Sequence, residues 1–120
     1  MDKAQALHKF WSGFGWKAYD EQTVPDKAEL PYITYEVSTG KLDDEIGLSA
    51  SLWFRSASWE EITKKSDEIA NAIGFGKIID IDEGRMWLRQ GMPFTQRMAG
   101  SGADVRRILL NITVEFMTKF

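Results

Sequence analysis

The stretch VRRILLNITVEFM, residues Val105–Met117, alternates in hydrophobicity over most of its length. From Ile108 to Phe116 every even-numbered residue is apolar, whereas the residues between them are mixed. Side chains of a strand alternate between its two faces, so this pattern predicts a long strand with one buried face. The opposite face carries Leu109 and Met117 among polar residues.

Other segments predict the strands that would pair with it. Residues 46–55 alternate most clearly, with Trp53 and Arg55 on the mostly polar side. Further strands are predicted at residues 16–19, 32–38, 77–82, 85–90 and 94–98. In residues 85–90 the alternation places Trp87 and Arg89 opposite Met86 and Leu88. Asp82-Glu83-Gly84 predicts a tight hairpin turn, and Gly91-Met92-Pro93 predicts a break before the last of these strands.

Two segments have helical spacing. In residues 2–14, one face is expected to carry Ala4, Leu7, His8 and Trp11. Residues 58–73 form the longer amphipathic segment, in which Ser58 and Glu61 have the spacing of a capping box. Glycines follow both segments and predict where they end.

The order of these elements is helix, strands, helix, strands, which predicts an α+β fold. We expect a mixed, mainly antiparallel sheet with two helices packed on one face plus a β-hairpin. The chain has 120 residues, so residues 1–120 are expected to form a single domain.

The second face of this sheet is predicted to hold more aromatic surface than two helices on the other side can cover. The chain has five tryptophans, of which Trp53 and Trp87 point away from the helical layer together with Leu109 and Met117. Apolar patches of this kind mark protein–protein contacts. The alternative is that the loop at residues 21–31 covers them.

Arginines form a second group of interface candidates. Arg97 precedes a Gly/Ser segment at residues 99–104 that we expect to be mobile, and Arg106 and Arg107 follow it. With Arg85 and Arg89 they predict a positive rim that meets phosphate or acidic side chains. The alternative is that they serve only the solubility of strand ends.

Catalytic and metal chemistry find little support in the sequence. His8 is the single histidine, cysteine is absent, and Asp80-Ile-Asp-Glu83 lacks the spacing of a calcium loop. Nucleophile and phosphate-loop motifs are missing. We therefore predict no enzyme activity and no catalytic, cofactor-binding or metal-binding residues. The net charge of −3 argues against a nucleic-acid binder, and the N-terminus lacks the apolar run of a signal peptide.

The segment AYDEQTVPDKAELPYITYE, residues Ala18–Glu36, resembles the tail terminator (tail completion) proteins of long-tailed bacteriophages and prophages. The late segment DVRRILLNITV, residues Asp104–Val114, is also similar to that family. The resemblance extends over nearly the whole chain in the order of its elements.

The resemblance implies a structural protein of the virion tail or neck, made in the bacterial host cytoplasm. Such proteins form a ring, typically a hexamer, which ends polymerisation of the major tail tube protein and joins the head connector. It implies partners but no cofactor, no membrane and no sequence-specific nucleic acid, although DNA passes through such a ring. The expected contacts use the exposed sheet face, the loop at residues 40–45 and the arginines. A head-closure or other neck protein, and a small-ligand-binding α+β domain, are the alternatives.

Overall fold

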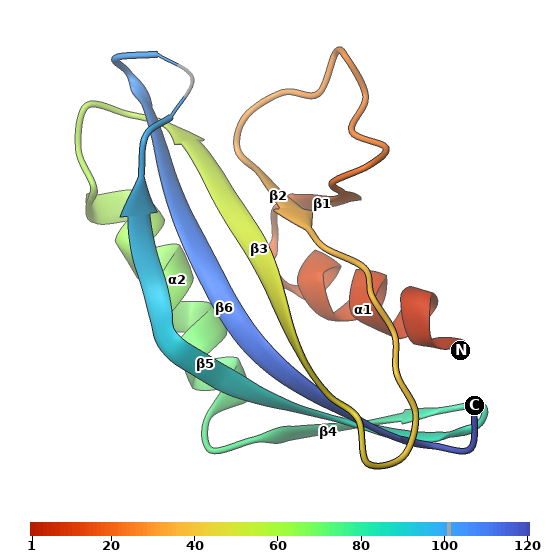
Figure 1. Ribbon diagram of the computed structural model, residues 1–120. Helices are drawn as coiled ribbons and strands as arrows, with labels where there is room; N and C mark the ends of the chain where they lie inside the picture. The colour runs from red at the N-terminus through yellow and green to blue at the C-terminus, as the bar shows by residue number, and fades with distance from the viewer. Residues whose placement is uncertain (101) are drawn as a thin grey trace.

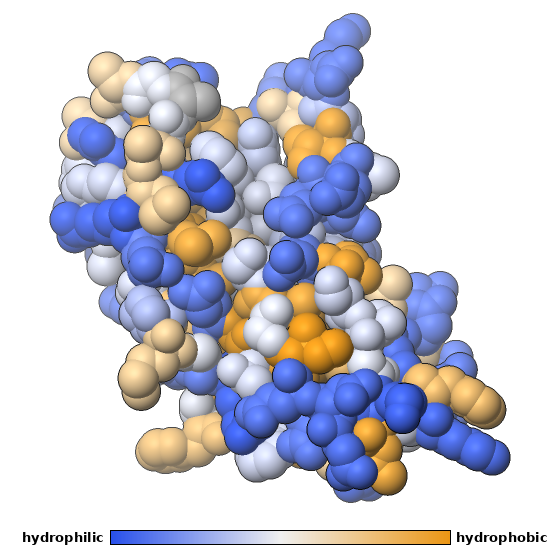
Figure 2. Space-filling view, viewed as in Figure 1, coloured by the Kyte–Doolittle hydropathy of each residue, from blue (hydrophilic) through white to orange (hydrophobic). Residues whose placement is uncertain are grey.

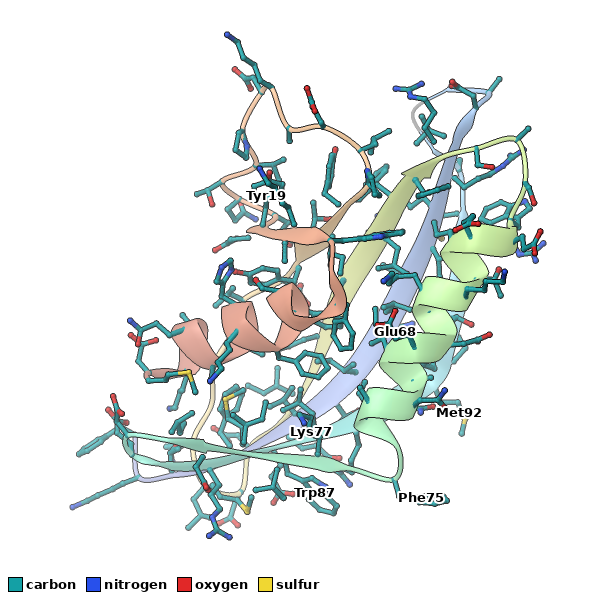
Figure 3. All side chains as sticks on the ribbon, turned by 180° about the vertical axis from the view of Figure 1, so that it is seen from behind. Tyr19, Glu68, Phe75, Lys77, Trp87 and Met92 are labelled. Carbon is teal, nitrogen blue, oxygen red and sulfur yellow. The ribbon has the colours of Figure 1, made fainter. Side chains whose placement is uncertain are left out.

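The computed structural model describes residues 1–100 and 102–120. Within them the chain folds into two α-helices, one 3₁₀ turn and a mixed sheet of six strands, which confirms the predicted α+β class. Both helices lie behind the sheet in Figure 1 and in front of it in Figure 3, so they cover the same face.

The elements follow the predicted order with shifted ends. The helices are α1 (Lys3–Trp11) and α2 (Glu60–Ile73), and the 3₁₀ turn is η1 (Ser12–Phe14). The strands are β1 (Lys17–Asp20), β2 (Tyr32–Tyr35), β3 (Glu45–Arg55), β4 (Lys77–Ile81), β5 (Gly84–Met98) and β6 (Val105–Thr118).

The sheet has the strand order β1-β2-β3-β6-β5-β4, and only β1 and β2 run parallel in the described sheet. The long strands β3, β6 and β5 form its centre, and the sheet twists strongly along them (Figure 1). Strand β6 is the predicted 105–117 segment, and its even-numbered residues from Ile108 to Phe116 are buried as expected. β4 and β5 form the predicted hairpin.

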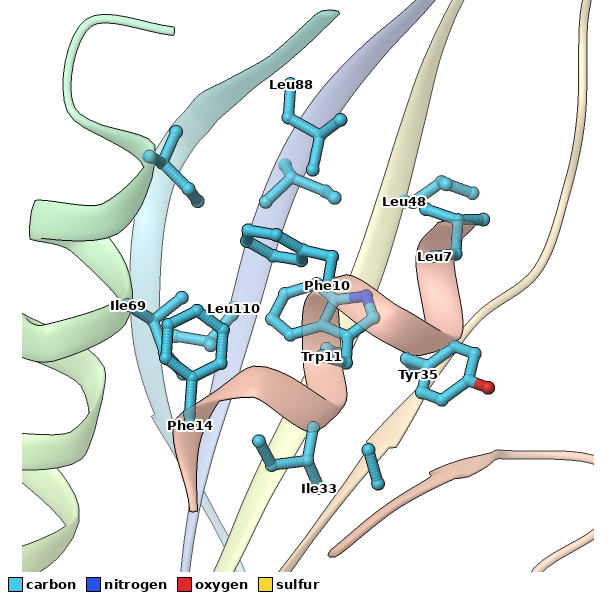
Figure 4. Packing of buried hydrophobic residues seen from close by; sticks show 14 of the residues in the cluster. Leu7, Phe10, Trp11, Phe14, Ile33, Tyr35, Leu48, Ile69, Leu88 and Leu110 are labelled. Atoms are coloured by element: carbon cyan, nitrogen blue, oxygen red, sulfur yellow. The ribbon is translucent and has the colours of Figure 1, made fainter. Parts of the chain in front are cut away.

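One buried hydrophobic cluster joins the helices to the sheet. Figure 4 shows Phe10, Trp11 and Phe14 of α1 and η1 packed near Ile69 of α2 and Leu110 of β6. Trp11 is 1% exposed and is the largest fully buried side chain. Its burial anchors α1 to the sheet, because large aromatic rings contribute most to the hydrophobic energy of a core.

Two sequence predictions about the helices are wrong. In α1 the buried face consists of Ala6, Leu7, Phe10 and Trp11, whereas Ala4 and His8 are exposed. In α2 the N-cap is Trp59 without a side-chain bond, so Ser58 and Glu61 do not form a capping box. Ser58 Oγ instead accepts a hydrogen bond from the Glu60 backbone N–H at 3.1 Å.

A true capping box occurs at α1. The Asp2 carboxylate accepts a hydrogen bond from the Gln5 backbone N–H at 2.8 Å, and the Gln5 side chain accepts one from the Asp2 backbone N–H at 3.0 Å. These two bonds satisfy amide groups that the first turn of any helix leaves without intrahelical partners.

Strand β5 continues through the predicted break at Gly91-Met-Pro93. Gln90 pairs with Ile112, but the next paired residue, Thr95, faces Leu110. This irregularity reverses which residues face the helices: Trp87 and Arg89 point to the uncovered face, whereas Arg97 points to the helical side opposite Ile108. A β-bulge re-aims side chains in this way.

Candidate interaction surfaces

The face of the sheet away from the helices carries six of the eight predicted interface residues. Strand register places these six on that face: Trp53, Arg55, Trp87, Arg89, Arg107 and Leu109. Arg97 and Arg106 lie on the helical side instead, because the register of β5 shifts and because Arg106 shares its face with Ile108. Figure 2, which looks at the uncovered face, shows hydrophobic groups interrupted by hydrophilic ones. Trp53 and Trp87 lie on this face as predicted, but on the separate strands β3 and β5.

Trp53 is held at one end of this face by its neighbours. Its indole N–H donates a hydrogen bond to Thr34 Oγ1 at 3.0 Å, and the Arg107 guanidinium lies 4.7 Å from the ring centroid. The Tyr32 ring lies 6.4 Å away on the next strand, and the Tyr19 ring contacts Tyr32 edge to face. These contacts leave Trp53 half-buried within the chain itself.

Trp87 is covered in a similar way at the other end. The Arg89 guanidinium lies 4.2 Å from the Trp87 ring centroid. Arg89 Nη2 also lies 2.5 Å from a Glu45 carboxylate oxygen and 4.0 Å from Glu115. Arg89 thus has its charge neutralised within the chain and shields one face of the Trp87 indole. Both Trp53 and Trp87 are therefore less exposed than the alternation pattern indicated.

Small polar side chains occupy the middle of the face. Gly47, Ser49, Asn111 and Thr113 line a shallow depression of about 400 Å³ that Met92 borders. Asn111 Nδ2 donates to the Pro93 carbonyl at 2.9 Å and to Gln96 Oε1 at 3.1 Å, which ties both sides of the bulge to β6.

Arg97 and Arg106 converge on Trp59 at the start of α2. The Arg97 and Arg106 Cζ atoms lie 4.7 Å and 5.2 Å from the Trp59 ring centroid. We call Arg97 and Arg106, together with the Trp59 ring that both contact, the Trp59 arginine pair. Arg106 Nη2 donates to the Ala57 carbonyl at 2.7 Å. The predicted positive rim is therefore divided: this pair lies on the helical side, Arg107 on the uncovered face, and Arg85 and Arg89 at the far end of β5.

Arg55 forms the ion pair at the same end of the sheet. Its Nη1 lies 2.7 Å from Asp104 Oδ2. The hydrogen bond from Arg55 is the main cause that lowers the pKa of the Asp104 carboxyl below its usual value. Asp104 closes the segment at residues 99–104, and its carbonyl accepts a bond from the Ser56 backbone N–H at 2.8 Å. Residue 101 of that segment lies outside the described residues, and the predicted mobility stays a prediction.

The most exposed apolar side chains are ones that the alternation pattern did not single out. Relative to an unfolded reference, Phe75 is 106% exposed and Met92 98%. Figure 3 shows both projecting from the side of the molecule that carries α2. Phe75 stands between two glycines with positive φ, and Met92 stands in the bulge of β5. The sequence signals for these two residues were local. Phe75 stands between Gly74 and Gly76, and Met92 directly precedes Pro93.

His8 has a structural environment. Its Nδ1 lies 2.8 Å from the Tyr35 hydroxyl, and Nε2 lies 3.3 Å from Ser12 Oγ. Burial, with a smaller contribution from the charge of Asp20, raises the pKa of the Tyr35 hydroxyl. Within residues 1–100 and 102–120, no group of three or more His, Cys, Asp or Glu side chains is placed to hold a metal ion. In the same residues neither helix has the length and apolar run needed to cross a bilayer.

No protein-family model and no curated protein sequence matches this chain.

Proposed function

We propose that this protein is a structural phage or prophage subunit that assembles into an oligomeric ring, caps the tail tube, ends its polymerisation and presents the surface that joins the head. The observation that supports this most is the sheet face that no helix covers in the described chain, with Trp53, Trp87 and Leu109 on it. A partner surface is the ordinary means of covering such a face.

Ring formation requires two different contact surfaces on each subunit, because the contacts in a cyclic ring above a dimer are heterologous. The described sheet ends in two edge strands, β1 and β4, which lie at opposite ends of the strand order. Phe75 is exposed just before β4, Ile78 is exposed on β4, and Tyr19 lies on β1. These two unlike edges are where we place the contacts between neighbouring subunits.

Capping would then proceed by surface complementarity without bond chemistry. Once a ring sits on the last layer of tube protein, further tube subunits find no matching surface. The opposite side of the ring is left for the head connector. The partners are thus further copies of this chain, the major tail tube protein and a connector or head-closure protein. The complex belongs to the tail or neck of the virion.

Growth of purified tail tube protein tests the proposal directly. Sub-stoichiometric addition of this chain is expected to shorten the tubes, because one ring per tube stops extension. Light scattering measures tube mass, and electron microscopy locates the chain at one tube end. If tubes grown with the chain are as long as tubes grown without it, capping is rejected. If the chain binds isolated capsids first and leaves tube growth unchanged, it is a head-closure protein instead.

A small-ligand-binding role is the second candidate, and one observation favours it. A groove of about 510 Å³ lies between α1, the end of α2 and β4, lined by Phe10, Phe14 and Ile79 with Lys9 and Lys77 at its rim. Apolar grooves with a few charged groups are typical of ligand sites. A metabolite that raises the melting temperature of the monomer, and loses this effect in Phe10→Ala, would support that role.

A further inference from the structure

The Trp59 arginine pair stands out by its charge environment. Arg55, Arg85 and Arg89 each lie within 4.0 Å of a carboxylate, whereas no ion pair in residues 1–100 and 102–120 involves Arg97 or Arg106. Both guanidinium carbons lie within 5.2 Å of one indole centroid. Two like charges on adjacent strands therefore lie beside one indole ring, and neither guanidinium has a carboxylate within 4.0 Å in the described residues.

Aromatic contact alone does not compensate fully for this arrangement. A guanidinium over an indole gains only weak stabilisation at an exposed site. Arg106 Nε is buried and has no acceptor in the described part of the chain, although Nη2 donates to the Ala57 carbonyl. Buried donors without acceptors are uncommon in folded proteins and call for a partner group. An added anion would supply acceptors and lower the repulsion between the two charges.

The surroundings decide which anion fits. Glu60 and Glu61 follow Trp59 directly and are exposed in the first turn of α2. A long uniform polyanion such as duplex DNA would be repelled there, and the chain as a whole has a net charge of −3. A short segment with a few carboxylates meets less of this repulsion, because fewer negative charges approach Glu60 and Glu61. The planar fork of arginine also matches a carboxylate with two parallel hydrogen bonds.

We propose that the Trp59 arginine pair is a docking site for an Asp- or Glu-rich segment of a partner protein. Arg97 and Arg106 bind the carboxylates, and Trp59 fixes the planes of both guanidiniums before the partner arrives. The site lies on the helical side of the sheet and not on the uncovered face. The inference rests on the proposed function in one respect, which is that the partner is a protein.

A fluorescent poly-glutamate peptide is the probe, measured by anisotropy at low salt against the full chain. The expected result is saturable binding that Arg97→Gln and Arg106→Gln together weaken by about tenfold or more, since each removes a charge-assisted hydrogen bond. Arg85→Gln is the matched control: it removes the same charge from an exposed arginine at the far end of β5 and should leave binding unchanged. Arg97→Lys keeps the charge but loses the fork, and an intermediate affinity is expected.

The outcomes separate this inference from the proposed function. Absence of poly-glutamate binding, or equal loss in the Arg85 control, overturns the docking site. Tighter binding of a duplex DNA oligonucleotide with the same arginine dependence overturns it in favour of a phosphate site. Should Arg106→Gln unfold the chain, Arg97→Gln alone decides, because Arg97 is exposed. A chain that fails to stop tube growth but binds poly-glutamate through these arginines rejects capping and leaves the docking site standing.

Discussion

At the scale of single residues, arginines in this protein act through short, specific contacts. Arg55 lies 2.7 Å from the Asp104 carboxylate, and Arg89 bridges Trp87 to Glu45. Strand alternation predicted the faces of Trp53, Trp87 and Leu109 correctly, but it carries no information on which neighbour covers a ring. The tryptophans were expected to be more exposed than they are, because a long side chain such as Arg107 or Arg89 can lie over an indole on an adjacent strand.

Replacing Arg55 by Gln should raise the pKa of Asp104 back towards that of an ordinary Asp, because the hydrogen bond from Arg55 is the main cause of its lowering. The sign follows from linkage: a carboxyl whose folded pKa is lowered stabilises the fold above its unfolded pKa and loses this contribution as pH falls through the folded pKa. The pair is exposed, so its effect on stability is small. Carbon-detected NMR titration of Asp104 measures the shift, and Arg85→Gln should leave it unchanged. An identical Asp104 titration in the Arg55 variant would contradict the assignment.

At the scale of elements, the sequence predicted where both helices and the strands lie, but it divided β5 into two strands and misplaced details that depend on tertiary packing. The Ser58 and Glu61 spacing fits a capping box, yet the N-cap of α2 is Trp59, whose ring lies against Arg97 and Arg106. The bulge of β5 inverts the face of Arg97 relative to Arg89. A glycine and a proline in a strand predict a break, but not how many residues the register gains there.

A pair of double-mutant cycles tests which helix has a capping box. Asp2→Ala should cost about 1 kcal/mol of unfolding free energy, and its combination with Gln5→Ala should be non-additive, because both side chains serve the same turn. Ser58→Ala combined with Glu61→Ala should be additive to within about 0.5 kcal/mol. Urea denaturation with a constant m-value measures all of these. Clear coupling between Ser58 and Glu61 would show that the box forms in solution.

At the scale of the whole molecule, the sheet separates a covered side from an open one, and the residues best placed to meet another chain are not those with the largest rings. Trp53 is held by Thr34 and Arg107, so its loss would disturb the monomer as well as any interface. Phe75 is fully exposed and flanked by Gly74 and Gly76. Its removal therefore reports on assembly with little effect on folding.

Phe75→Ser should leave the unfolding free energy within about 0.5 kcal/mol of the parent, as expected for an exposed side chain. The same change should weaken self-association, measured by sedimentation velocity over a range of concentrations, and should reduce the shortening of tail tubes. Trp53→Ala should instead lower stability by a few kcal/mol, because a half-buried aromatic loses its packing. Phe120→Ser is the matched control, since it removes another exposed phenyl ring, at the C-terminal end of the chain. If Phe75→Ser sediments like the parent protein, the edge beside β4 is not a subunit contact, and the contacts must be sought on the uncovered sheet face around Trp53 and Leu109.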